Sequence, residues 1–200
     1  MRRALLVAAL VAWVAVPAAH ADGDPASDYL YTQQVFVPFD IKASTQALGD
    51  LQRTVAGATQ AGFRIRVAVI GSAYDLGAVP ALWRKPRAYA RFLGAELAFV
   101  YKGRLLIVMP NGFGFYWRGH PVTREYATLA GVSIEPGAEG IVRAAQHAVS
   151  QLAAAAGVKV AGASPPHSTA TRDRLIIFLA SAAAVALALL ARVLLRRRRA

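Results

Sequence analysis

Apolar residues recur at helical spacing in three segments of the chain. The first follows Ser44, a candidate N-cap, and can end at Gly62; the second follows Pro86; the third runs from Glu139 to a stop at Gly157. The apolar positions that define the stripes are Leu48, Leu51, Val55 and Ala58, then Tyr89, Leu93, Leu97 and Val100, and finally Ile141, Ala145, Ala148 and Leu152. Each stripe predicts an amphipathic helix that buries one face.

Shorter apolar runs lie between these helices and predict strands. Residues 63–71 read FRIRVAVIG, which alternates at first and then becomes fully apolar, and residues 104–110 read RLLIVMP. Residues 29–38, YLYTQQVFVP, predict a further peripheral strand that Pro38 closes. Helix, strand, helix, strand and helix in succession predict a layered α/β domain with parallel neighbours in its sheet.

The segment before the second buried run admits two interpretations. Lys102-Gly103 can be a hairpin turn, which would make residues 98–101 a short strand antiparallel to RLLIVM. Alternatively, the second helix continues almost to Gly103, and the two buried runs are parallel strands of one crossover unit. We expect the second arrangement, in which both strands end on the same side, the usual ligand side of an open α/β sheet.

The stretch MPNGFGFYWRGH at 109–120 predicts a tight hairpin after the second strand. Asn111-Gly112 is a strong turn signal, because both residues tolerate positive φ, and the aromatic residues that follow alternate like one face of a returning strand. Trp117 occupies the third-glycine position of a dinucleotide fingerprint, which argues against a bound pyrophosphate. The hairpin tip and the end of the first strand together form the candidate ligand edge: Ser72, Asp75, Asn111 and Gly112.

Both ends of the chain predict a membrane-anchored protein. Residues 1–21 have the layout of a secretory signal peptide with cleavage after Ala21; an uncleaved anchor is the alternative. Residues 175–195 predict a helix of roughly 31 Å that would span a bilayer once. The basic stub at 196–200 predicts a cytoplasmic C-terminus in the plasma membrane, with domain 22–156 outside and a linker at 157–174. Small residues at every fourth position of the span would allow a homodimer: Ala180, Ala184 and Ala188.

Much of the positive net charge lies at the two ends of the chain, so it is poor evidence for a nucleic-acid partner. The chain carries 23 basic and 11 acidic residues, a formal +12. Nine of the basic residues and one acidic residue lie at the two ends, so the outer region keeps 14 basic and 10 acidic residues. We therefore expect no nucleic-acid partner. Four cations beside Trp83 and Tyr89 are a candidate patch for anionic headgroups, cell-wall polymer or an acidic protein, or else a solvated helix start: Arg84, Lys85, Arg87 and Arg91.

Searches for catalytic motifs leave few candidates. The chain contains no P-loop, no zinc-binding His-Glu-x-x-His, no nucleophile elbow and no cysteine. Asp22, Asp24 and Asp28 supply three carboxylates near the mature N-terminus, whereas calcium needs six to eight oxygens, so we expect a solvated leader there and no metal site. Asp75 is the better-placed carboxylate, as a ligand-edge group or as a turn cap. No cofactor is expected; Ca²⁺ or Mg²⁺ is the alternative.

Part of the chain, about residues 28–115, resembles the TPM family of extracytoplasmic domains. The resemblance rests on Asp28 and Leu30, RIRVAVIGS, the pair Tyr89-Ala90 and GRLLIV; Tyr101-Lys102 stands where the family has Asp-Asn. It implies a three-layer α/β/α sandwich with a small, mainly parallel or mixed sheet and, for some members, an acidic calcium site or phosphatase activity. DLGAVPALWRKPRAYARFLGAEL and LLIVMPNGFG are also similar to uncharacterised bacterial membrane-anchored proteins.

The sequence thus predicts a membrane-tethered, outward-facing accessory or binding module without a recognisable catalytic set. Its expected partners are the lipid bilayer and an envelope or membrane protein. One alternative is a metal-dependent phosphatase of the TPM type that uses Asp75. Another is a binder of anionic envelope polymer through Arg84, Lys85 and Arg87.

Overall fold

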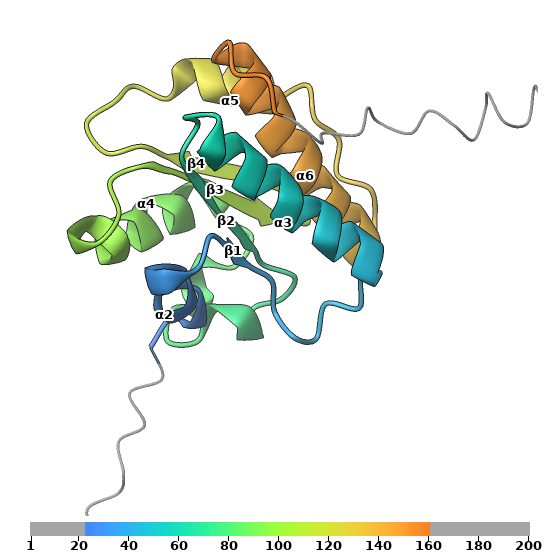
Figure 1. Cartoon of the computed structure of the whole chain (residues 1–200). Helices are drawn as coiled ribbons and strands as arrows, with labels where there is room; N and C mark the ends of the chain where they lie inside the picture. The colour runs from blue at the N-terminus through green and yellow to red at the C-terminus, as the bar shows by residue number, and fades with distance from the viewer. Residues whose placement is uncertain (1–22, 161–200) are drawn as a thin grey trace, which may run out of the picture. The chain divides into compact units, whose positions relative to one another are not determined.

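The computed structural model describes residues 23–160 (Figure 1). The predicted signal peptide, the predicted membrane span and the basic stub lie outside the described residues. Between residues 23 and 160, no helix has both the length and the apolar character needed to cross a bilayer.

Helices and strands alternate along most of the described chain. The helices are α2 (Pro25–Thr32), α3 (Thr45–Gln60), α4 (Pro86–Glu96), α5 (Thr123–Leu129) and α6 (Ala138–Ala155). The strands are β1 (Val35–Phe36), β2 (Ile65–Val69), β3 (Arg104–Met109) and β4 (Gly112–Tyr116). Three short 3-10 helices complete the connections: η1 (Tyr74–Leu76), η2 (Pro80–Leu82) and η3 (Leu97–Phe99). The domain is a mixed α/β fold, as the sequence predicts.

The four strands form one sheet in the order β1-β2-β3-β4. β1, β2 and β3 are parallel, and β4 is antiparallel to β3. The pairing of Val69 with Val108 shows that β2 and β3 end side by side. We call this side of the sheet the carboxyl edge, and the side where β2 and β3 begin the amino edge. The parallel crossover is therefore confirmed, and the alternative hairpin at Lys102-Gly103 is wrong.

Successive side chains along a strand point to opposite faces of the sheet, and each face belongs to its own hydrophobic core. On β2, Val67 and Val69 pack with α3, α5 and α6, whereas Ala68 packs on the opposite face with α2 and α4. Figure 1 shows α3 and α6 side by side over one face of the sheet. The period of two along a strand covered on both faces explains why residues 67–70 are all apolar.

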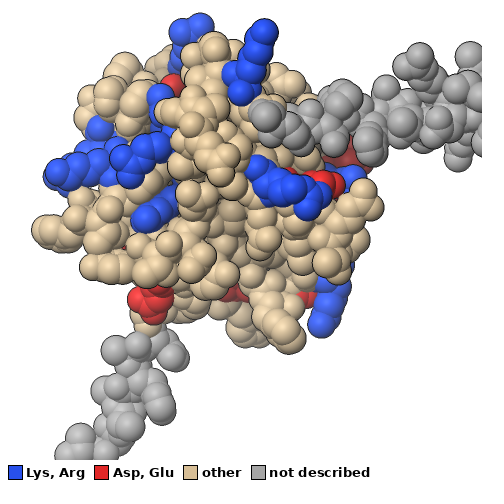
Figure 2. Space-filling view, viewed as in Figure 1, with Lys and Arg blue, Asp and Glu red and all other residues tan. Residues whose placement is uncertain are grey.

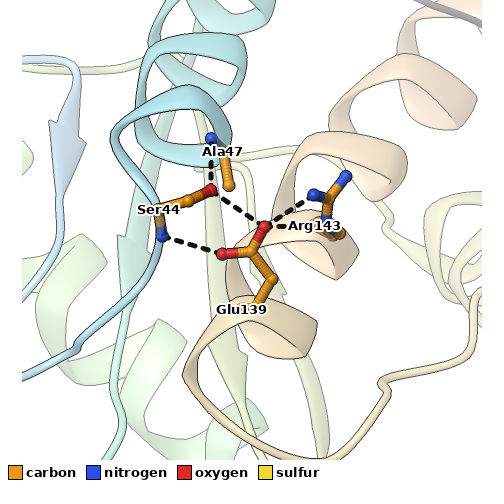
Figure 3. A network of polar contacts seen from close by, with 4 residues as sticks. All are labelled: Ser44, Ala47, Glu139 and Arg143. Carbon is orange, nitrogen blue, oxygen red and sulfur yellow. Dashed lines mark hydrogen bonds and ion pairs between the residues drawn. The ribbon is translucent and has the colours of Figure 1, made fainter.

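Glu139 joins the starts of α3 and α6 (Figure 3). Ser44 caps α3 through its hydroxyl, which accepts from the Ala47 amide at 3.1 Å. The Glu139 carboxylate accepts from the Ser44 amide at 2.8 Å and from the Ser44 hydroxyl at 3.0 Å, and it also binds Arg143. A capping box normally uses a Glu three residues after the cap, where this chain has Ala47. In this domain, Glu139 supplies the carboxylate of the box from 95 residues away. Its contacts with Ser44 and Arg143 lower the pKa of Glu139.

Helix α4 lies unusually close to β4 because two glycines leave room for it. A Cβ at Gly114 would stand 1.9 Å from the Pro86 carbonyl oxygen, and a Cβ at Gly94 would stand 2.1 Å from the Tyr116 ring. Gly114 of the stretch 109–120 therefore serves the packing of α4 on the sheet, as Gly94 does from the helix side. On the free side of β4, the Tyr126 hydroxyl accepts from the Phe115 amide at 2.9 Å and donates to the Phe115 carbonyl, which covers an exposed strand edge.

The peripheral strand predicted at 29–38 is mostly wrong. Residues 25–32 form α2, and only Val35–Phe36 pair at the sheet edge. The reason lies just upstream: Asp24 caps the helix by accepting from the Ala26 amide, and Pro25 occupies the first helical turn. Ala26 and Leu30, four residues apart, then bury one face. The prediction of a solvated leader is also wrong for Asp24, which is 5% exposed.

Three further features of the structure differ from the predictions. Helix α4 ends at Glu96 and continues only as the single 3-10 turn of η3. The predicted hairpin is confirmed, but Met109 pairs with Gly112, so Pro110 and Asn111 occupy the turn, and only Gly112 has positive φ. Helix α5 was not predicted, because its seven residues are too few to show a clear apolar stripe.

Candidate functional site

All four residues of the candidate ligand edge lie at the carboxyl edge of the sheet. Ser72 and Asp75 follow the end of β2, and the pairing continues beyond that strand through a hydrogen bond from the Ile70 amide to the Val108 carbonyl. Asn111 and Gly112 form the neighbouring hairpin between β3 and β4. The predicted common location is therefore correct.

Asp75 holds the loop after β2 closed. One of its carboxylate oxygens accepts from the Gly71 amide at 2.8 Å and from the Ser72 amide at 2.7 Å, and the side chain is buried. The neighbouring Ser72 hydroxyl is buried and has no hydrogen-bond partner among the described residues. Asp75 thus acts as a cap of the loop.

A second buried carboxylate, Asp24, lies beside the same loop. Both of its oxygens accept from the Tyr89 hydroxyl of α4, at 2.7 and 2.8 Å. Burial raises the pKa of Asp24 to about 6, although the bonds from Tyr89 and from the Ala26 amide act in the opposite direction. The N-terminal segment packs closely against Gly77, where a Cβ would lie 2.4 Å from the Gly23 carbonyl oxygen. Asp24 followed by proline is a sequence signal for the start of α2, although not for the contact with Tyr89.

The hairpin tip binds the start of α4 directly. The Asn111 side-chain amide donates to the Arg84 carbonyl at 2.7 Å. Arg84 has φ of 59°, and it is the single described residue other than glycine with positive φ. This contact brings the candidate ligand edge and the basic patch together, which the sequence did not predict. A non-glycine residue in this region stores strain that the Asn111 bond helps to maintain.

We expect Arg84→Gly to stabilise the domain by up to about 1 kcal/mol, because glycine adopts positive φ without the steric cost of a Cβ. The Arg84 side chain is exposed, so little packing is lost. Urea denaturation of the two proteins measures the difference. Lys85→Gly is the matched control: Lys85 has φ of −119°, and glycine there should destabilise. Equal destabilisation by both changes would show that Arg84 carries no strain.

The basic patch is exposed, and one of its four cations is held against an aromatic ring. Arg84, Lys85, Arg87 and Arg91 are all exposed. The Arg87 guanidinium stacks over the Tyr126 ring of α5 at 4.3 Å, beside the covered edge of β4. Figure 2 shows basic side chains gathered on the side of the domain where α4 and the loop between β4 and α5 lie, with few acidic side chains beside them.

Two nearly fully exposed aromatic residues also follow the parallel strands, and sequence patterns did not indicate them. Phe39 lies after β1 and is 97% exposed, and Tyr74 lies after β2 and is 93% exposed. The two loops touch, because a Cβ at Gly71 would lie 3.0 Å from the Ile41 side chain. We call Phe39 and Tyr74 the aromatic lip. Isolated aromatics in loops have no periodicity, so only the fold reveals that they are exposed together.

In the part of the chain that the structure describes, no three His, Asp or Glu side chains lie together in a way that could hold a metal ion. Comparisons of the chain with protein-family models, with curated proteins and with solved structures give no match. Function is therefore inferred from the geometry of the domain.

Proposed function

We propose that this protein is a membrane-tethered binding module that faces outward and contacts an envelope or membrane protein through its carboxyl edge. One observation carries this proposal: the two buried carboxylates at the edge are engaged within the fold, whereas the aromatic lip is almost fully exposed and is flanked by cations and by Asp40. Asp75 binds two amides, and Asp24 is held by Tyr89. General acid or base catalysis requires a group that can reach the substrate proton.

The composition of this edge suits recognition. Aromatic residues and arginine are enriched in protein interfaces and supply most of their hot spots. Phe39 and Tyr74 lie in loops that follow strands of the sheet, and each ring has only two rotatable side-chain bonds, so little side-chain entropy is lost when a partner covers them. Lys42, whose ammonium lies 5.3 Å from the Phe39 ring centroid, adds a cation beside the lip.

The location of the protein is part of the proposal. A signal peptide at 1–21 and a single span at 175–195 would hold the domain outside the plasma membrane, with the basic stub inside. Helices on both faces of the four-strand sheet support a three-layer α/β/α sandwich of the kind that the TPM resemblance implies.

The proposal is tested by cross-linking the full chain in its native membrane. Because the chain has no cysteine, Tyr74→Cys places a single thiol-linked photo-cross-linker in the lip, and Tyr31→Cys on α2 is the control. We expect a discrete protein adduct from position 74 only. Phe39→Ser should weaken that adduct at least about tenfold, since truncating a hot-spot aromatic costs about 2 kcal/mol or more.

Two outcomes would contradict the proposal. The first is hydrolysis of a generic phosphate ester by the purified chain, abolished by Asp75→Asn, because a catalytic carboxylate would then operate at the edge. The second is retention on cell-wall polymer without any protein adduct, reduced by neutralising Arg84, Lys85 and Arg87, because the partner would then be the polymer.

A further inference from the structure

A second group of cations lies at the opposite side of the sheet, at the amino edge. β2 and β3 begin there, β4 ends there, and each has a basic residue at its terminus or within two residues of it. We call the following residues the amino-edge basic cluster: Arg64, Lys102, Arg104 and Arg118. Within residues 23–160 the ion pairs are Arg53 with Asp50 and Arg143 with Glu139, so none of the cluster is neutralised by a paired carboxylate.

Arg104 is held in a stack of rings. Its guanidinium lies 4.3 Å from the centroid of Phe63 and 3.9 Å from that of Trp117, and the Trp117 indole stacks in turn on His120 at 3.7 Å. The two ring contacts restrict the position of the guanidinium, whose N–H groups are suited to binding an oxyanion. Burial lowers the pKa of Arg104, and Tyr101 and Glu125 of α5 act in the opposite direction. Glu125 forms no ion pair with Arg104.

Tyr101 fixes the turn that carries Lys102. Its hydroxyl donates to the Arg104 carbonyl at 2.9 Å, and Arg66 stacks over its ring at 4.2 Å. A Cβ at Gly103 would lie 2.5 Å from the Tyr101 oxygen, so only glycine leaves room for this bond. The turn therefore has a fixed shape, and Lys102 is exposed beside it.

An exposed aromatic residue completes the edge. Phe99, in η3 just before β3, is 97% exposed. Glu96, at the end of α4, is the nearest exposed carboxylate in the sequence. An apolar ring beside unpaired Lys and Arg is the combination that binds the interface of an anionic bilayer, where cations meet phosphate groups and the ring enters the headgroup layer.

The described chain also ends at the amino edge. α3 and α6 both begin beside the carboxyl edge, where Glu139 binds Ser44, and both run toward the amino edge (Figure 1). Val158 and Val160 still pack against the core. Fourteen residues, 161–174, separate this point from the predicted span. As a flexible coil they would reach on the order of 20 Å, which keeps the edge close to a membrane.

We propose that the amino-edge basic cluster and Phe99 dock on the anionic phospholipid headgroups of the membrane in which the chain is anchored. This inference rests on the proposed anchoring. The carboxyl edge, with the aromatic lip, then faces away from the bilayer and stays available to a partner.

The test uses the full chain in vesicles of phosphatidylcholine with or without phosphatidylglycerol. An environment-sensitive fluorophore is attached to a single cysteine, Ala98→Cys beside Phe99 or Ala81→Cys at the carboxyl edge. We expect a blue shift at position 98 only, only with phosphatidylglycerol, and reversed by salt. Arg64→Gln, Lys102→Gln and Arg118→Gln combined should lower the ratio of docked to undocked domain on the order of 100-fold, at about fivefold per cation.

The matched control neutralises Arg84, Lys85 and Arg91 and should leave the shift unchanged. The proposal is overturned if the shift occurs equally without phosphatidylglycerol, if it survives the triple change at the amino edge, or if position 81 shifts instead. Alkaline carbonate extraction tests anchoring separately. If the chain is extracted, the anchoring proposal fails, and sedimentation of the chain with preformed vesicles still decides whether the amino edge binds anionic lipid.

Discussion

Replacing Gly114 with alanine is expected to destabilise the domain by about 3 kcal/mol or more, since overpacking a close contact costs about 1–3 kcal/mol and rigid neighbours raise the cost. The added methyl would lie 1.9 Å from the Pro86 carbonyl oxygen, and backbone at a helix start cannot move aside as a flexible side chain can. Separation of α4 from β4 would also disturb the Asn111 contact with Arg84. Urea unfolding followed by circular dichroism measures the change.

Gly131→Ala is the matched control for this substitution. Its Cβ would lie 3.5 Å from the Thr128 carbonyl oxygen, an ordinary contact. Alanine there should alter the free energy of unfolding by less than about 1 kcal/mol. A Gly114→Ala protein as stable as this control would show that α4 does not approach β4 as closely as described.

The second large effect is a loss of stability as pH rises through the titration of Asp24. Burial raises the pKa of this carboxyl from 3.8 to about 6, so the folded protein binds the proton more tightly than the unfolded chain. The stabilisation is fully present below pH 3.8 and is lost as pH rises through 6. The total corresponds to about 3 kcal/mol. The groups that act on Asp24 are Tyr89, Ala26, Asp28 and Glu96.

Asp24→Asn tests the origin of this dependence. Asparagine can still cap α2 and accept from Tyr89, but it carries no charge to bury. We expect the variant to be more stable than the unsubstituted protein at pH 8 by about 2 kcal/mol and similar to it near pH 4. Comparing the two proteins at each pH removes the opposite contribution of Glu139, whose pKa is lowered. An unchanged difference across this range would mean that Asp24 does not titrate with a raised pKa.

The sequence predicted the elements whose signals are local. Leu51, Val55 and Ala58 repeat at helical spacing and lie in the core, and the cap at Ser44 is where the pattern places it. The fully apolar run of β2 indicated a strand covered on both faces, which the two cores confirm. The failure at α2 was also local, because the alternating aromatic residues after Tyr29 outweighed the Asp24-Pro25 signal that begins a helix.

The candidate site was predictable only in its location. Parallel strands must end on one side, so Ser72, Asp75 and the hairpin tip had to lie near one another. Their roles depend on contacts between distant segments, such as Tyr89 with Asp24 across 65 positions and Asn111 with Arg84 across 27. No local pattern encodes such distances.

By itself, the sequence determined the α/β class, and it favoured the parallel crossover that sets the carboxyl edge, because hydrophobic period and chain direction are properties of neighbouring residues. Only the tertiary structure decided how the polar and aromatic residues are used. Burial assigns Asp24 and Asp75 to the framework, and exposure leaves Phe39, Tyr74 and Phe99 free. The tertiary structure also brings Arg64, Lys102, Arg104 and Arg118 together at the amino edge. Exposure and proximity arise from packing among distant segments, which single-chain periodicity does not contain.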